Sequence, residues 1–220
     1  KDGIAKVTGA EKYAPDVSVD RMWFGRVLRS PHAHARIVSV DTSAAEAMGA
    51  VCLTFADVPQ TRYNERIVST PPCLYRDRTV VADKARHVGE ALVGVAAPTE
   101  ELAEKALRSI KIEYEVLQVI TTIEQAQKDG ADPVHDTVLL NGEDKPIINN
   151  VAVQRTIDVG DTVKGFAESD FVIERSFKTG RIYHAQMEPK TVICQPEADG
   201  GITVWASTQS IHNTRILLGQ

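Results

Sequence analysis

One stretch of the chain, residues 91–116, constrains the fold more than any other. It opens with ALVGVAA, a continuous apolar run whose length is typical of a strand buried on both faces. Thr99 then precedes a helical pattern with two glutamates in its first turn. Residues 110–116 alternate apolar and polar side chains, which is the period of a half-exposed strand. This succession of strand, helix and strand predicts an α+β (mixed α/β) fold. The apolar positions of the helix share one face: Leu102, Ala106, Leu107 and Ile110.

The region before residue 91 predicts further strands and one long irregular stretch. Ser43 and Glu46 have the spacing of a capping box, and Gly49 can take the left-handed conformation that ends a short helix. Residues 57–89 contain three prolines and few periodic runs. This stretch is either a contact or substrate-entrance surface or a merely solvated loop. The strands are expected at residues 22–28, 35–40 and 50–55.

The composition changes over residues 129–150, where glycine, aspartate, proline and asparagine dominate and no periodicity survives. We therefore predict a first domain over residues 1–128, a linker over 129–150 and a second unit over 151–220. In the second unit, Asp161 is expected to cap a short helix that ends at Glu168. A last helix begins at Ser210 and runs to the end without a settled stop beyond Gly219, so we expect a fragment or one piece of a split subunit. Strands are expected at 151–159, 171–184, 191–195 and 202–207, the last two joined by a hairpin at Gly200 and Gly201.

Charge and cysteine usage exclude several classes of protein. The formal net charge is −5 and the isoelectric point is near 5.7, so the chain has no basic field to attract a nucleic acid. Its apolar runs are much shorter than the roughly 18 residues that a membrane helix needs. The three cysteines, Cys52, Cys73 and Cys194, are too far apart for a disulfide framework or an iron–sulfur site. We expect a cytoplasmic protein, and any iron–sulfur cluster must lie on another polypeptide.

Few residues point to chemistry on their own. His32 and His34 would share one face of a strand and could bind a metal such as zinc, but a third ligand is not evident, so hydrogen-bonded structural histidines are the favoured alternative. The common phosphate-loop, nucleophile-elbow and zinc-protease motifs are absent from the sequence. Glu188 would be a buried carboxylate or a turn residue before a strand, and Gln209 a helix cap.

Several motifs nevertheless occur together and in order. Three lie in the first domain: DGIAKVTGAEKYAPD at residues 2–16, RSPHAHARI at 29–37 and HVGEALVGVAA at 87–97. Four lie in the second unit: VGD at 159–161, GFAESDF at 165–171, HAQMEP at 184–189 and STQ at 207–209. Over nearly its whole length, the chain resembles the molybdenum-binding large subunit of the xanthine dehydrogenase and aldehyde oxidase family.

This resemblance implies a fold and a reaction. Residues 1–128 would form the a/b hammerhead domain, and residues 151–220 would begin an α+β molybdopterin-binding domain. The family inserts a water-derived oxygen at an electron-poor carbon of an aldehyde or a purine-like N-heterocycle. Electrons leave through [2Fe-2S] clusters and often FAD, which we expect on partner chains or domains. The resemblance places Gln209 beside the molybdenum cofactor as a hydrogen-bond donor, with Glu188 as a supporting residue.

The sequence also departs from the family pattern. The GGGFGG segment and the late glutamate that acts as general base are absent, so we expect no catalytic residue and no metal ligand in this chain. The remainder of the large subunit and the iron–sulfur and flavin subunits would complete the enzyme. The alternative is a non-catalytic scaffold or assembly module that keeps the fold without the activity.

Overall fold

Strand β6 (Ala91–Ala97) is the centre of the first sheet, as its continuous apolar sequence predicts. In the computed structural model, which describes residues 2–64, 75–151, 154 and 156–219, β6 pairs antiparallel with β1 (Phe24–Arg29) and with β3 (Val51–Leu53). The sheet order is β1-β6-β3. Leu92 and Val93 are only 2% and 0% exposed, so the centre of this strand belongs to the hydrophobic core.

Helix α3 (Glu100–Ser109) packs against β1 and β6. Its first turn is capped as predicted, because Thr99 Oγ1 accepts a hydrogen bond of 3.2 Å from the backbone N–H of Leu102. Ala103 and Ala106 are fully buried on the helix face that meets the sheet. Small side chains on that face permit a close approach of the helix to the sheet.

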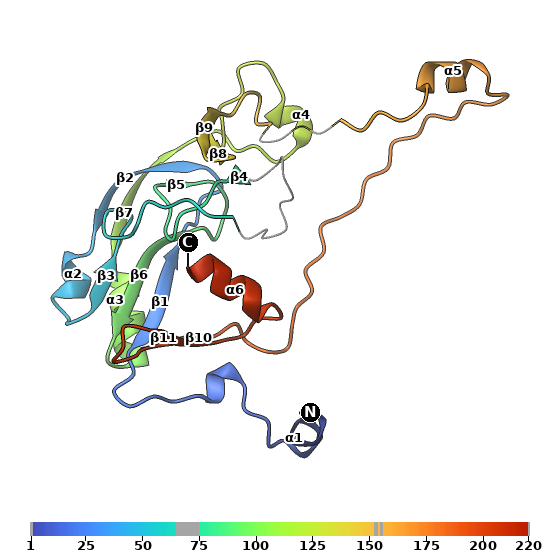
Figure 1. The fold of residues 1–220 in the computed structure, drawn as a ribbon. Helices are drawn as coiled ribbons and strands as arrows, with labels where there is room; N and C mark the ends of the chain where they lie inside the picture. The colour runs from blue at the N-terminus through green and yellow to red at the C-terminus, as the bar shows by residue number, and fades with distance from the viewer. Residues whose placement is uncertain (1, 65–74, 152–153, 155, 220) are drawn as a thin grey trace.

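The second sheet has the order β5-β2-β7, with β5 at Lys84–Ala85, β2 at Ala35–Asp41 and β7 at Lys111–Val116. Strands β2 and β7 are antiparallel, and β7 follows α3 directly, which confirms the predicted strand, helix and strand (Figure 1).

The short helix α2 (Ser43–Glu46) forms where it was expected, but its predicted capping box is wrong. Thr42 is the N-cap residue, and its Oγ1 donates to Glu46 Oε1 at 2.7 Å. The hydroxyl and amide of Ser43 are instead hydrogen-bonded to Asp41 Oδ1, which removes Ser43 from the cap. Gly49 adopts the predicted left-handed conformation with φ of +85°.

A third small sheet lies inside residues 129–150, where the composition indicated only a linker. Strands β8 (Thr137–Leu140) and β9 (Glu143–Pro146) form a hairpin, and β4 (Tyr75–Arg76) pairs with β8. Asn141 and Gly142 connect β8 to β9 with φ values of +52° and +87°. Two successive positive φ angles are the hallmark of a tight hairpin turn that favours Asn-Gly. The expected absence of regular structure over 129–150 is therefore wrong, while the predicted domain boundary itself stays a prediction.

Part of the irregular stretch 57–89 is packed into the body. Val81, Ala82 and Ala85 are buried, and Tyr63 forms an antiparallel bridge with Arg78. Residues 65–74 of this stretch lie outside the described residues. The solvated-loop interpretation therefore does not hold for the segment that contains these buried side chains.

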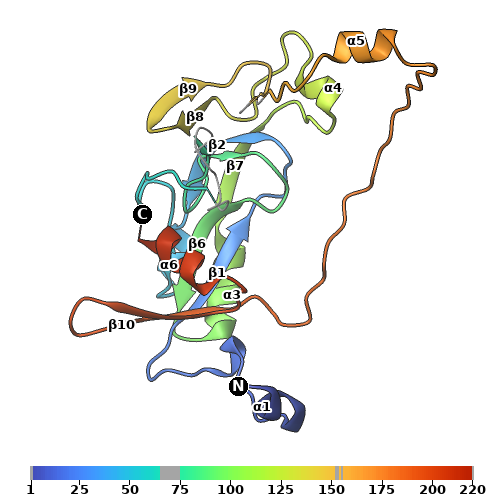
Figure 2. The same cartoon turned by 45° about the vertical axis from the view of Figure 1, so that its right-hand side comes forward.

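The last third of the chain contains a hairpin and two helices. Strands β10 (Val192–Pro196) and β11 (Ile202–Ala206) form the predicted hairpin, and Gly200 adopts φ of +87° in its turn. Helix α5 (Thr162–Ala167) lies at the tip of a long extended arm, far from the hairpin, and α6 (Ile211–Leu218) lies beside the body (Figures 1 and 2). Asp161 caps α5 as predicted, since its carboxylate accepts a hydrogen bond of 2.9 Å from the Lys164 amide.

The strands predicted at 171–184 and 151–159 are wrong for the described residues. Residues 171–184 are extended but unpaired, and Phe177 is 91% exposed. Of the described residues between 151 and 159, only Val151 forms a β-bridge. A strand requires a neighbour for its backbone hydrogen bonds, and the described part of the chain supplies none along this arm.

Three short elements complete the described structure: α1 (Gly3–Thr8), the 3-10 helix η1 (Ala14–Asp16) and α4 (Ile123–Ala126). Within the ranges that the structure describes, every helix is too short or too polar to span a membrane.

Candidate functional site

The loop of residues 207–210, here called the Gln209 loop, connects β11 to α6. Ser207 attaches this loop to the segment that contains Glu188, because its hydroxyl donates to the carbonyl oxygen of Pro189 at 2.9 Å. Its backbone N–H also donates to the carbonyl oxygen of Thr191 at 3.0 Å. The structure therefore brings the two predicted site segments together at the open end of the β10–β11 hairpin, where Val192 pairs with Ala206.

Gln209 is exposed, and its side chain has no hydrogen-bond partner among the described residues. The N-cap residue of α6 is Ser210, so the interpretation of Gln209 as a helix cap is wrong. Glu188 is also exposed rather than buried. Both side chains are thus available to a group that lies outside the described structure.

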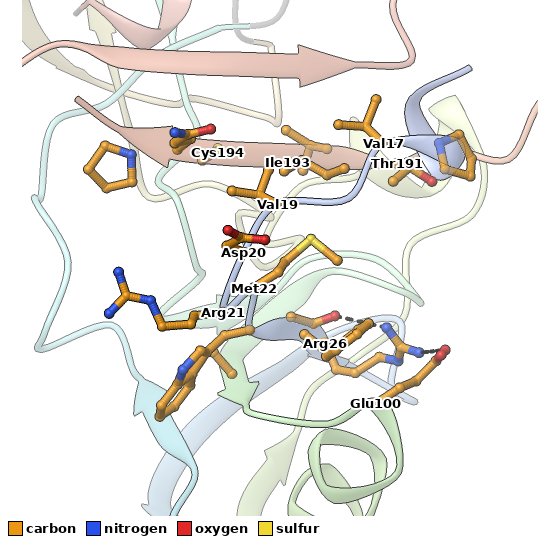
Figure 3. A pocket seen from close by; sticks show the side chains of 18 residues that line it. Val17, Val19, Asp20, Arg21, Met22, Arg26, Glu100, Thr191, Ile193 and Cys194 are labelled. Atoms are coloured by element: carbon orange, nitrogen blue, oxygen red, sulfur yellow. Dashed lines mark hydrogen bonds and ion pairs between the residues drawn. The ribbon is translucent and has the colours of Figure 1, made fainter. Parts of the chain in front are cut away.

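A groove of about 1130 Å³ lies between β10 and the N-terminal segment of residues 15–23 (Figure 3). Val19 and Met22 of that segment face Ile193 of β10, and an ion pair between Arg26 and Glu100 lies on the opposite side of the groove. Neither Gln209 nor Glu188 lines it. Sequence reasoning missed this groove because it joins segments that are far apart in the chain and carry no shared motif.

A second, polar cavity of about 290 Å³ lies between the body and the β8–β9 hairpin. Next to it, the buried side chain of Lys84 donates from Nζ to the carbonyl oxygen of Pro133 at 2.9 Å. Arg86 in the cavity wall forms an ion pair with Asp83 at 3.0 Å. Burial lowers the pKa of Lys84, and the nearby carboxylate of Asp136 partly opposes this shift. The contacts of Lys84 with Pro133 and Asp136 therefore hold the segment that follows α4 against the body.

The burial of His135 predicts that the stability of this region depends on pH. Burial, and then the charge of Arg86, lower the pKa of His135 below its ordinary value of 6.5, while Asp77 opposes the shift. The folded state therefore favours neutral His135, and its contribution to stability is complete above pH 6.5 and is lost as the pH falls through the lowered pKa. We expect the urea concentration at the midpoint of unfolding to decrease when the pH is lowered from 7.5 to 5.5. This decrease should be smaller in His135→Gln. The exposed His87 provides the control: His87→Gln should retain the full pH dependence, and an equal change in both variants would contradict the assignment.

The histidine pair does not form a metal site in the described structure. His34 is buried and its Nδ1 bonds to the carbonyl oxygen of Gln118 at 2.7 Å, while the ring of His32 packs edge-on against Tyr114. Both residues lie at a bend before β2 rather than on a strand. No group of three or more metal-ligating side chains occurs among the described residues. The hydrogen-bonded structural interpretation therefore fits His34.

The described cysteines, Cys52 and Cys194, are both free thiols. Burial raises the pKa of the Cys52 thiol, which disfavours its thiolate form. Cys73 lies outside the described residues.

Two family models match the chain. Residues 8–118 match the aldehyde oxidase and xanthine dehydrogenase a/b hammerhead domain, and residues 144–220 match a molybdopterin cofactor-binding domain. The second match includes both Glu188 and Gln209.

Curated relatives support the same family. The chain is 37% identical to a probable xanthine dehydrogenase subunit of Bacillus subtilis, over 100% of this chain and 27% of that protein. It is 34% identical to the nicotinate dehydrogenase large molybdopterin subunit of Eubacterium barkeri, over 97% of this chain and 47% of that protein. The chain thus spans about a quarter to a half of the length of these relatives.

Solved structures agree in fold. The aldehyde oxidoreductase of Desulfovibrio desulfuricans matches 98% of this chain and 24% of its own chain, with a TM-score of 0.81 and 25% identity. The predicted α+β fold class and the resemblance inferred from the motifs are confirmed by these findings. The chain belongs to the aldehyde oxidase and xanthine dehydrogenase family of molybdenum-binding proteins.

Proposed function

We propose that this chain is part of the large subunit of a molybdenum hydroxylase and that it contributes one wall of the cofactor site. The observation that carries the proposal is the exposed, unpartnered amide of Gln209 on a loop whose neighbours are hydrogen-bonded. Its place inside the segment that matches a molybdopterin cofactor-binding domain supports the same conclusion.

The residues of the Gln209 loop fit a polar, oxygen-rich group. The backbone amides of Ser207, Thr208 and Ser210 already donate within the protein, so among the described residues of this loop the backbone N–H and the side-chain amide of Gln209 are left to donate to a ligand. An amide can donate a hydrogen bond without adding a charge, and it can orient a ligand oxygen. Glu188 would support this wall from the adjoining segment. When bound, the molybdenum cofactor would supply the two-electron redox chemistry, and the protein would supply binding and orientation.

The complete enzyme would hydroxylate an N-heterocycle or an aldehyde, with water as the source of the oxygen. The names of the relatives, which include xanthine and nicotinate dehydrogenases and an aldehyde oxidoreductase, support these two substrate classes. Because the chain spans only part of their length, the remainder of a large subunit would complete the site. Electrons would pass to [2Fe-2S] and FAD groups on partner chains or domains, in the cytoplasm.

Native mass spectrometry with metal analysis tests this proposal on the protein purified from its source. We expect a complex larger than the 24.1 kDa of this chain, with molybdenum and iron bound. We also expect it to oxidise at least one of three probes, namely xanthine, nicotinate or an aromatic aldehyde. A complex that contains the chain but neither molybdenum nor activity would contradict the proposal and favour a scaffold module.

A further inference from the structure

The hydroxyl of Ser207 extends the β10–β11 ladder beyond its last strand pair, Val192 with Ala206. At the next step, Ser207 Oγ accepts a hydrogen bond of 3.2 Å from the backbone N–H of Thr191. The same oxygen donates to the carbonyl oxygen of Pro189 at 2.9 Å. One hydroxyl can donate once and accept twice, so both bonds are compatible. The side chain of Ser207 therefore takes the place of a backbone group at the end of the hairpin.

Pro189 lies just beyond the end of this ladder. A proline has no backbone N–H, so an antiparallel ladder cannot continue through it in the ordinary way. Its carbonyl oxygen can still accept, and the donor that it receives is the Ser207 hydroxyl. Removing this hydroxyl would leave both the Pro189 carbonyl and the Thr191 amide without their partner in the described structure. The segment that carries Glu188 would then lose a direct link to the Gln209 loop.

A second hydroxyl, that of Thr208, links the residues immediately before and after Gln209. Thr208 Oγ1 accepts a hydrogen bond of 3.1 Å from the Ser210 amide, and it lies 3.2 Å from Thr214 Oγ1 in the first turn of α6. Thr214 Oγ1 in turn donates to the Ser210 carbonyl oxygen at 3.0 Å. The backbone is thus anchored immediately before and after Gln209, while the Gln209 side chain remains exposed.

We propose that Ser207 is a positioning residue that fixes the Gln209 amide relative to the 187–189 segment. This inference rests on the proposed function, because it assigns Ser207 a task in the same cofactor wall. Ser207 itself would not contact the cofactor; it acts through the backbone of the loop that carries Gln209. Groups that orient a metal site indirectly change its activity by about 10- to 100-fold when they are removed.

The test compares Ser207→Ala with Ser207→Thr in the cofactor-loaded holoenzyme. We expect Ser207→Ala to lower kcat about 10-fold while KM changes less than about twofold and molybdenum remains bound. Backbone amides of residues 190–191 and 207–210 should exchange hydrogen roughly fivefold faster, as expected when one hydrogen bond is lost. Ser207→Thr keeps the hydroxyl and should restore both kcat and exchange.

Thr203→Val is the matched control, since it removes a hydroxyl from the other end of the same hairpin, where Thr203 bonds to Glu197 at 2.6 Å. If Ser207→Ala matches Thr203→Val in kcat and in exchange near residue 209, the positioning role is wrong. The hydrogen-exchange comparison tests the positioning role even if the variants show no measurable activity. Gln209→Ala separates the two claims: if it is fully active, the proposed function fails, whereas a defect in Gln209→Ala without one in Ser207→Ala overturns only the role of Ser207.

Discussion

Val93→Asp is expected to unfold the hammerhead domain. Val93 is 0% exposed at the centre of β6 and pairs with Leu28 of β1. A carboxylate at this position would lose its hydration without gaining a partner, at an effective cost of several kcal/mol. Domains of ordinary stability have only about 5–15 kcal/mol in total. Circular dichroism during urea denaturation should therefore show a lost or strongly shifted transition.

The control for this prediction is Val51→Asp, in strand β3 of the same sheet. Val51 is 51% exposed, so the new carboxylate can stay hydrated and the change in the free energy of unfolding should be about 0.5 kcal/mol. Leu92→Ala is a milder change in the same strand. Because Leu92 is 2% exposed, its truncation should lower the free energy of unfolding by about 2–5 kcal/mol. Equal stability of Val93→Asp and Val51→Asp would show that β6 is not the centre of the core.

The strand, helix and strand of residues 91–116 could be predicted because their signals are local. The apolar run of β6, the Thr99 cap and the alternation in β7 each lie within a few residues of the structure that they specify. The packing also agrees with these signals, since Ala106 and Ile110 of the predicted apolar face are buried in the core and Leu102 and Leu107 pack against it. Local and tertiary preferences therefore point to one structure here.

The β8–β9 hairpin could not be predicted from hydrophobic periodicity, because its strands lack a clear apolar alternation. Strand β9 reads EDKP and is exposed throughout. The informative signal is the turn: Asn141-Gly142 is the dipeptide that best tolerates two positive φ angles. The pairing of β4 with β8 joins residues that are far apart in the chain and could not be read from either segment alone.

Residues 171–184 show the opposite case: their sequence pattern predicts a strand, but the structure contains no strand there. An alternation of apolar and polar residues indicates only which side chains could share a face. A strand forms only where the backbone of a second segment provides hydrogen bonds. Phe171 and Phe177 are exposed on the extended arm, so their pattern has no sheet to pack against in the described structure. The Gln209 loop shows the same limit, because its contact with Pro189 depends on how the intervening hairpin folds.

Gln209→Ala is expected to lower kcat/KM of the holoenzyme by about 100-fold, if the amide donates to the bound cofactor as proposed. The side-chain amide of Gln209 is unpartnered in the described structure, while the residues on either side of it are hydrogen-bonded, so its removal should change the site with little change in the fold. Steady-state kinetics with the best of the three probes gives the rate. Circular dichroism and molybdenum content confirm that the variant is folded and loaded.

Two further variants make the Gln209 prediction specific to the amide and its position. Gln209→Glu keeps the size of the side chain but replaces the donor with a charged acceptor, so it should lose at least as much activity as Gln209→Ala. Gln127→Ala makes the same truncation at an exposed glutamine just after α4 and should keep the parental rate. Wild-type kcat/KM in a molybdenum-loaded Gln209→Ala enzyme would show that this amide does not serve the cofactor. Loss in Gln209→Ala with recovery in Gln209→Glu would instead show that side-chain volume matters there and hydrogen-bond donation does not.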